Sequence, residues 1–224
     1  MYIADAEILA VSIHESHEPL VDLKNQTELA YGSPPENLLT EPDYTKMRKT
    51  VYQKLCAAQK DLPSGWYFRV YEGFRSLKVQ QMLFEEEYAR VKGRYLDKSH
   101  AELFRETTRL ISPVKNLDGS MNIPPHNTGA AVDVEIMDAS GNLIDMGMAI
   151  ADWVHFNPDL CLSHCDLLSL EAQSNRRILL EVMQSHDFVN YPMEWWHFSY
   201  GDRFWAYHKK VPHALYGSMD ENVS

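Results

Sequence analysis

The sequence predicts an α+β fold, in which helices flank a mostly antiparallel central sheet. Segments with helical spacing of apolar residues dominate the first half, and short aromatic or β-branched runs between turn signals follow in the second. The length of 224 residues suits one domain whose core needs neither a disulfide nor a structural metal. We therefore expect a single domain over 1–224, with 1–30 as an N-terminal extension.

The first half of the chain is expected to contain three helices and one strand. Residues 1–43 are interrupted by prolines and are predicted to be irregular. The expected elements after them are a helix over 44–60, a strand over 66–71, a helix from Ser76, its N-cap, to about Val91, and a helix over 97–110.

The second half is expected to hold the rest of the sheet. Residues 112–129 are rich in proline and glycine and are predicted to form a loop that carries His126. Residues 148–168 show no pattern that favours one structure. The other expected elements are a strand over 131–137, a hairpin turn at DASGN with its partner strand over 143–146, a helix that starts at Ser174, and aromatic segments over 188–191 and 194–200.

Composition narrows the possible partners. The formal net charge of −11 repels phosphate backbones, so nucleic acid is not expected as a partner. No apolar run reaches the roughly 18 residues of a membrane span. The three cysteines cannot all pair within the chain, and the start MYIADAEILAV lacks the basic region of a signal peptide. We expect a cytoplasmic protein, or a periplasmic one if a signal was removed, and the oligomeric state stays open.

His126 and Asp133 in PPHNTGAAVDVEI are candidate metal ligands. Their separation of seven residues would put them on opposite faces of one continuous strand. Thr128-Gly129 lies between them and can break the strand, so that His126 comes from the loop and Asp133 from the strand. A carboxylate within AAVDVEI is costly to bury unless it is paired or bound to a metal. The alternative for His126 is an exposed loop histidine.

Glu194 and His197 in MEWWHFSY form a second candidate pair. The aromatic composition favours a strand, on which positions i and i+3 face opposite ways, unless a bulge or tight turn intervenes. The alternative is an aromatic core strand with a hydrogen-bonded histidine. Two imidazoles and one carboxylate can hold Zn²⁺ with a fourth position open for water. A nearby glutamate is the usual proton shuttle in metal-assisted hydrolysis.

Arg75 follows the strand expected over 66–71. An arginine fixed at this point can present its planar donor fork to a carbonyl oxygen that becomes negative during attack. The alternative is a surface arginine that pairs with Glu72 or caps the sheet.

These segments resemble the zinc D-alanyl-D-alanine dipeptidases, a metallopeptidase group that also contains bacterial D,D-carboxypeptidases and shares its fold with the hedgehog signalling domain. The resemblance extends from roughly Tyr31 to Tyr200. It depends on AAQKDLPSGWYFRVYEGFRS, HNTGAAVD, GNLIDMG and NRRILLEVMQSHDFVNYPMEWWHF. The pair H-x6-D alone is a weak signal, but H-x6-D with a downstream EWWH and an upstream G-F-R is a specific combination.

The resemblance implies a hedgehog or D,D-peptidase-like fold with one Zn²⁺ per chain. It implies that His126, Asp133 and His197 are zinc ligands, that Glu194 is the catalytic base, and that Arg75 stabilises the tetrahedral intermediate. The implied reaction is hydrolysis of the D-Ala-D-Ala dipeptide, in which Glu194 takes a proton from the metal-activated water and returns it to the leaving amine.

The chain departs from this family on the substrate side. Vancomycin-resistance dipeptidases usually carry a serine directly before the first zinc histidine, where this chain has Pro124-Pro125. They also place an aspartate for the ammonium group of the dipeptide a few residues beyond the Met-Gly of the hairpin. Here Ala151 falls at that place and Asp152 follows it. Asp152 and Tyr31 are the candidate substrate-binding residues.

Three functions therefore compete. The first is a zinc D-Ala-D-Ala dipeptidase that acts on cell-wall precursors or recycled peptidoglycan fragments. The second is a zinc D,D- or L,D-carboxypeptidase that trims longer stem peptides, which the missing aspartate at position 151 suggests. The third is a non-catalytic zinc-binding module, although a purely structural site needs neither Glu194 nor Arg75.

Overall fold

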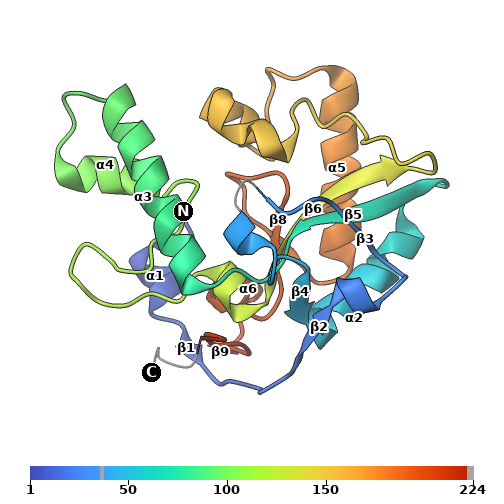
Figure 1. The fold of residues 1–224 in the computed structure, drawn as a ribbon, viewed down its shortest axis with the longest axis horizontal. Helices are drawn as coiled ribbons and strands as arrows, with labels where there is room; N and C mark the ends of the chain where they lie inside the picture. Colours follow the sequence, from blue (N-terminus) through green and yellow to red (C-terminus); the bar gives the residue numbers. More distant parts are fainter. Residues whose placement is uncertain (36–37, 221–224) are drawn as a thin grey trace.

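A five-stranded sheet forms the centre of the fold (Figure 1). The structure is a computed structural model that describes residues 1–35 and 38–220. The strand order is β3-β5-β6-β8-β7, and all neighbours are antiparallel except the parallel pair β3 and β5. The α+β class is confirmed, with one parallel edge. The strands are β3 (Ala30–Tyr31), β5 (Trp66–Glu72), β6 (Ala131–Asp138), β7 (Val189–Asn190) and β8 (His197–Ser199).

Two small sheets attach the N-terminal region to the rest of the chain. Strand β1 (Ser12–Ile13) pairs in parallel with β9 (His213–Ala214), and β2 (Leu20–Asp22) pairs antiparallel with β4 (Lys46–Arg48). The segment 1–43 therefore contains strands, where the sequence predicts irregular structure. The helix predicted from residue 44 begins later, because 46–48 pair with β2 instead.

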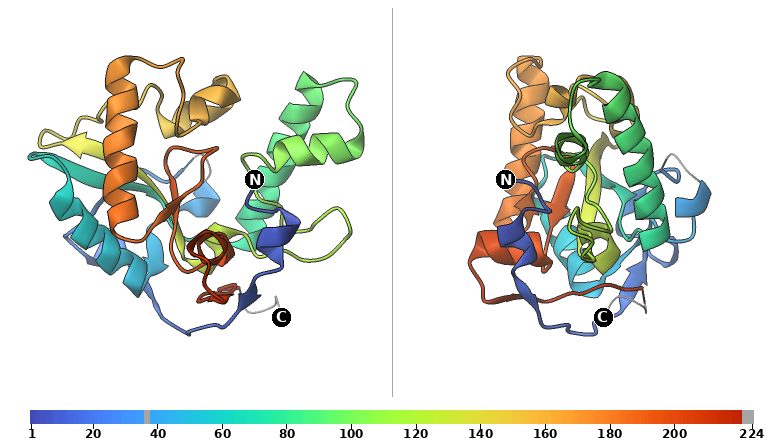
Figure 2. Two further views of the ribbon diagram at one scale, coloured as in Figure 1. Left: turned by 180° about the vertical axis from the view of Figure 1, so that it is seen from behind. Right: turned by 90° about the vertical axis from the view of Figure 1, so that its left-hand side faces the viewer.

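Helices flank the sheet on both sides (Figures 1 and 2). The predicted helix from Ser76 is confirmed, whereas the helix predicted over 97–110 is shorter and begins at residue 100, because Ser99 caps it. The helix predicted from Ser174 starts four residues earlier, because the Ser169 hydroxyl caps it by accepting from the backbone N–H of Ala172. The α-helices are α1 (Ala6–Leu9), α2 (Lys49–Ala58), α3 (Leu77–Arg94), α4 (His100–Thr107), α5 (Leu170–Ser185) and α6 (Arg203–Lys209).

Short 3₁₀ helices supply several connections. Two of them, η5 and η6, occupy the stretch for which the sequence shows no pattern. The 3₁₀ helices are η1 (Leu23–Asn25), η2 (Leu38–Thr40), η3 (Gln59–Asp61), η4 (Pro125–Thr128), η5 (Ile150–His155) and η6 (Pro158–Cys161).

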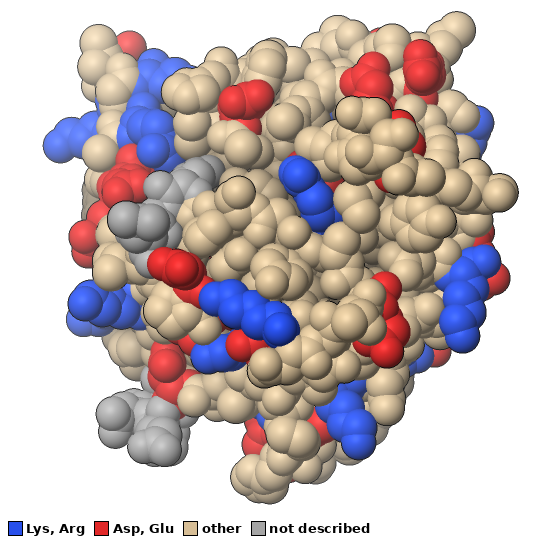
Figure 3. All heavy atoms as spheres, turned by 45° about the vertical axis from the view of Figure 1, so that its right-hand side comes forward, with Lys and Arg blue, Asp and Glu red and all other residues tan. Residues whose placement is uncertain are grey.

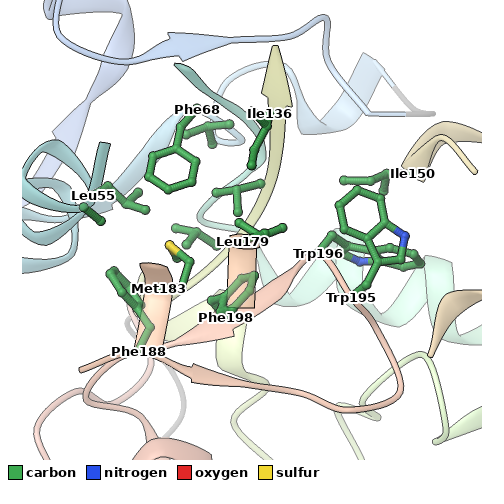
Figure 4. Close-up of a cluster of buried hydrophobic side chains, with 14 of the residues drawn as sticks. Leu55, Phe68, Ile136, Ile150, Leu179, Met183, Phe188, Trp195, Trp196 and Phe198 are labelled. Carbon is green, nitrogen blue, oxygen red and sulfur yellow. The ribbon is translucent and has the colours of Figure 1, made fainter. Parts of the chain in front are cut away.

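The side chains of strand β6 alternate between an apolar face of the sheet and a polar one. Val132, Val134 and Ile136 belong to the main hydrophobic core, whereas Asp133 and Glu135 alternate with them and point to the opposite face. Helices α2 and α5 cover the apolar face (Figure 4). This face buries Leu55 from α2, Leu179 and Met183 from α5, and Phe68, Ile136 and Phe198 from the sheet.

The prediction of a partner strand over 143–146 is wrong. Leu143 forms a single bridge with Met137, and the Ile144 N–H donates to the Ile136 carbonyl at 2.8 Å. The chain then turns away, because Asp145 accepts from the Gly147 N–H at 2.7 Å and Gly147 has a φ of +83°. Residues 131–138 therefore pair along most of the strand with β5 and β8, and they pair with residues 142–144 only next to the turn.

Charged side chains of both signs share the surface. On the face shown in Figure 3, Lys and Arg are scattered among Asp and Glu instead of forming a continuous basic patch. The cysteines Cys56, Cys161 and Cys165 are all free. Within 1–35 and 38–220, no helix is both long and apolar enough to cross a membrane.

Candidate metal centre and catalytic residues

The register of the sheet aligns three site residues across neighbouring strands. Glu72 on β5 lies opposite Asp133 on β6, which lies opposite His197 on β8. Directly opposed residues of antiparallel strands share a face. A β-bulge adds Tyr71 to β5, so that Glu72 rather than Tyr71 is paired with Asp133.

His126 reaches this row from the 3₁₀ helix η4. Gly129 ends that helix with a left-handed φ of +69°, after which the chain enters β6. A side chain at Gly129 would also collide with Leu20, since its Cβ would lie 2.6 Å from the Leu20 Cδ2. The prediction that His126 comes from the loop and Asp133 from the strand is confirmed. His126 is buried, so the alternative of an exposed loop histidine is wrong.

A tight turn brings Glu194 towards His197. The Glu194 N–H donates to the Tyr191 carbonyl at 2.9 Å, and the His197 N–H donates to the Glu194 carbonyl at 3.2 Å. The Asn190 side-chain amide holds the same turn by donating to the carbonyls of Glu194 and His197, at 3.1 and 3.0 Å. The Glu194 Oε2 consequently lies 3.7 Å from the His197 Nδ1, as the tight-turn interpretation requires.

Three donor atoms converge beside Glu194. The His126 Nε2 lies 3.1 Å from the His197 Nδ1 and 3.4 Å from the Asp133 Oδ1, and the last two atoms are 3.0 Å apart. Ligands about 2.0–2.1 Å from a tetrahedral Zn²⁺ are roughly 3.3 Å from one another, so these atoms fit an ion of that size. Because a carbonyl only accepts, the 2.7 Å contact between the His126 Nδ1 and the Gly73 oxygen leaves the Nε2 lone pair for a metal.

The charges of the site follow from burial and from these neighbours. Burial favours a raised pKa for Asp133, but the two imidazoles more than offset it and hold that pKa below its usual range. Burial lowers the pKa of His197. Burial and the nearby Asp133 carboxylate raise the pKa of Glu194 well above its ordinary value, although Arg75 opposes them. An ionised Asp133 and a neutral His197 are the forms that bind a metal.

Arg75 lies in the same site and is held by two side chains. Its Nε donates to the Glu72 Oε1 at 2.9 Å, its Nη2 donates to the Glu72 Oε2, and its Nη1 donates to the Gln80 Oε1 at 3.0 Å. Burial alone would lower the pKa of Arg75, but the Glu72 carboxylate reverses this effect and raises it. Arg75 does pair with Glu72, but within the buried site and not at the surface.

Sequence reasoning names Glu72 only as the partner of a surface arginine and does not find Gln80. The sequence feature that could have pointed to Gln80 is its place in the first turn of α3, four residues after the N-cap Ser76. Its side-chain amide also donates to the Ser112 carbonyl at 2.7 Å, which fixes the orientation of the oxygen that accepts from Arg75.

A cavity of about 60 Å³ adjoins the donor atoms, Arg75 and Glu194. The two candidate substrate-binding residues do not line it. Asp152 is exposed on η5, and Tyr31, which is 40% exposed on β3, packs edge-on against Tyr44. The apolar part of the wall includes Ile3, Tyr71, Leu83, Ile111, Ile150, Trp153 and Trp196.

Comparison with known proteins identifies the family to which this site belongs. The model of the M15 peptidases, described as D-Ala-D-Ala dipeptidase, matches residues 39–215. The chain belongs to the M15 D-Ala-D-Ala dipeptidase family. It is therefore a metallopeptidase, and the resemblance seen in the sequence is confirmed.

Individual relatives of this M15 peptidase agree with that assignment. It is 27% identical to a D-alanyl-D-alanine dipeptidase of Synechocystis sp., over 95% of this chain and 96% of the relative. It is 37% identical to a D-alanyl-D-alanine dipeptidase of Escherichia coli over 33% of this chain and 36% of the relative. The family and these relatives support D-Ala-D-Ala dipeptidase or a related D,D-peptidase activity.

A solved structure is also similar to this M15 peptidase. It is a vancomycin-resistance D,D-pentapeptidase in complex with Zn(II), with 17% sequence identity and a TM-score of 0.46. The match covers 92% of this chain and 95% of that one.

Proposed function

We propose that this M15 peptidase is a zinc-dependent dipeptidase that hydrolyses D-alanyl-D-alanine to two D-alanines. The observation that carries the proposal is the convergence of the His126, Asp133 and His197 donor atoms within 3.0–3.4 Å of one another, beside Glu194 and Arg75. Two imidazoles and one carboxylate are a common ligand set for catalytic zinc. When bound there, zinc supplies a Lewis acid and lowers the pKa of water.

Glu194 and Arg75, which lie beside the donor atoms, carry out the other parts of the proposed reaction. Glu194, whose pKa is raised, takes the proton of the attacking water and returns it to the leaving amine. Arg75 uses three of its five N–H groups to bind Glu72 and Gln80, which leaves two for the peptide carbonyl oxygen as it becomes negative. Because Glu72 and Gln80 fix the guanidinium, it needs no reorganisation when that charge develops.

The size of the cavity favours a small substrate. Its volume of about 60 Å³ has room for only a few small groups, since one water molecule needs about 10–15 Å³. A free dipeptide is the smallest peptide that contains the scissile bond. We therefore infer that the substrate is D-Ala-D-Ala released from, or destined for, peptidoglycan.

The direct test is to incubate the zinc-loaded protein with D-Ala-D-Ala and to measure free D-alanine. We expect release that is lost in Glu194→Gln and absent with L-Ala-L-Ala. No release from D-Ala-D-Ala or from any other D-amino dipeptide would overturn the proposal.

One observation favours a D,D- or L,D-carboxypeptidase as the second candidate. A dipeptidase gains from a carboxylate that binds the free ammonium of its substrate, and Asp152 is exposed and does not line the cavity. The carboxylates that do line the cavity already have partners or roles, namely Glu72, Asp133 and Glu194. Comparing free with N-acetylated D-Ala-D-Ala separates the two enzymes, since equal rates favour the carboxypeptidase and a strong preference for the free dipeptide favours the dipeptidase.

A further inference from the structure

The first residues of the chain form part of the cavity wall. Ile3 is 8% exposed and lines the same cavity as Arg75, Glu194 and the three metal-binding candidates. The residues from Tyr2 to Leu9, here called the N-terminal arm, lie outside the segment that matches the family model. The arm therefore adds to the cavity wall from outside the segment that the family model matches.

Contacts with α4 hold the arm in place. Both guanidinium nitrogens Nη1 and Nη2 of Arg105 bind the Asp5 carboxylate, and the same guanidinium lies 4.0 Å from the centre of the Tyr2 ring. Asp5 also accepts from the Tyr2 N–H at 2.7 Å, so the arm is folded back on itself next to α4. Figure 2 shows the N-terminus near α4 in both views.

Apolar packing fixes Ile3 itself from the other side. Ile3 and Ile8 form a buried cluster with Tyr191 and Phe204. Tyr191 in turn accepts from the Glu194 N–H through its carbonyl and donates its hydroxyl to the Arg109 carbonyl at 2.7 Å. Ile3 is thus packed against the segment that positions the catalytic glutamate.

We propose that Ile3 is a specificity-determining residue, and that the N-terminal arm excludes peptides longer than a dipeptide by closing one end of the cavity. This inference rests on the proposed dipeptidase function. It also removes a difficulty of that function, because exclusion by size selects a dipeptide without a carboxylate for its ammonium group. Asp152 then has no part in selection.

The test is to open the wall with Ile3→Ala and to compare three substrates. These are D-Ala-D-Ala, N-acetyl-D-Ala-D-Ala, which is longer at the amino end, and D-Ala-D-Ala-Gly, which is longer at the carboxyl end. A single methylene in an apolar pocket changes discrimination by about 10-fold or more, and Ile3→Ala removes three carbons. We expect the kcat/KM of at least one longer peptide, relative to D-Ala-D-Ala, to rise at least about 10-fold. The peptide that gains identifies the end that the arm covers.

Two matched comparisons separate the wall from a general loosening of the arm. Ile8→Ala removes the same atoms from the same cluster, but Ile8 does not line this cavity. Arg105→Ala removes the ion pair with Asp5, and Arg105 does not line the cavity. Its control is Arg94→Ala, which removes an exposed arginine of the neighbouring helix α3. A gain in Ile3→Ala without a gain in Ile8→Ala, and a gain in Arg105→Ala above Arg94→Ala, support the proposal. No gain in Ile3→Ala, or an equal gain in Ile8→Ala, overturns it.

Binding supplies a second readout that does not depend on turnover. In a Glu194→Gln background, calorimetry should show that Ile3→Ala tightens the Kd of the favoured longer peptide at least about 10-fold relative to that of D-Ala-D-Ala. The two proposals fail differently. If the unaltered protein releases no D-alanine, the proposed function fails, whereas normal release with an unchanged preference in Ile3→Ala refutes only the role of the arm.

Discussion

The buried ion pair between Glu72 and Arg75 gives the sharpest prediction for stability. The side chain of Glu72 is 2% exposed and that of Arg75 is 9% exposed, and two hydrogen bonds join them. Removing one partner of such a pair costs about 3–5 kcal/mol, because the other charge stays buried without compensation. In Glu72→Ala, the Asp133 carboxylate still partly compensates Arg75, so we expect the lower end, about 3 kcal/mol of unfolding free energy.

The measurement is urea unfolding followed by circular dichroism, with a chelator present so that no metal contributes. The matched control is Glu106→Ala, which breaks the ion pair with Lys98, whose two side chains are 29% and 31% exposed. Exposed pairs contribute less than about 1 kcal/mol, so the control should unfold near the parent midpoint. A loss in Glu72→Ala no greater than in Glu106→Ala would refute the reasoning.

A double-mutant cycle isolates the pair itself. If Arg75 destabilises the protein only when it lacks its carboxylate, Arg75→Ala combined with Glu72→Ala should cost clearly less than the sum of the two single changes. Additive costs would mean that the two side chains do not interact in solution. Such a result would also remove the support that the pair gives to the orientation of Arg75.

The remaining predictions concern the metal and one glycine. His126→Ala should lower the zinc content together with the activity. Glu194→Ala should keep its zinc while turnover falls about 10²–10⁴-fold. Metal analysis that finds full zinc occupancy in the His126 variant would disprove the ligand assignment. Zinc at 100 times its Kd should stabilise the parent by about 2.7 kcal/mol, so a chelator should lower the Tm of the parent and leave that of the His126 variant unchanged. Gly129→Ala should cost about 0.5–1.5 kcal/mol more than Gly141→Ala, because both glycines have positive φ but only at Gly129 would the new Cβ force the Leu20 side chain out of its rotamer. Equal unfolding midpoints would contradict the steric argument.

Local signals predicted most of the elements, and long-range pairing explains the exceptions. The helix cap Ser76 acts within one turn, so the sequence around it is sufficient to predict the start of α3. Met47 continues the apolar spacing of α2, yet it lies in a strand because Val21 pairs with it from the distant β2. No periodicity within 44–60 contains that information.

In the candidate site, too, some residues can be predicted from the local sequence and others depend on long-range packing. Asp133 is recognisable from sequence because a carboxylate in an apolar strand conflicts with local rules, and such conflicts mark functional sites. Glu72 faces Asp133 only because of the bulge at Tyr71, which the sequence of β5 does not announce. Ile3 reaches the cavity through packing with residues such as Tyr191, far along the chain, and nothing in its neighbourhood distinguishes it from an ordinary apolar residue.

The geometry of η5 explains why this segment offers the cavity no carboxylate. A 3₁₀ helix has three residues per turn, so Ile150 and Trp153 lie on one side, and both line the cavity. Ala151 and Asp152 fall between them and are exposed. A carboxylate at position 151 or 152 would therefore point to solvent unless Ile150 and Trp153 left the wall. η5 therefore supplies only apolar wall and no carboxylate for the substrate ammonium, so selection for a dipeptide depends on how far the apolar wall extends, and the arm that carries Ile3 extends it.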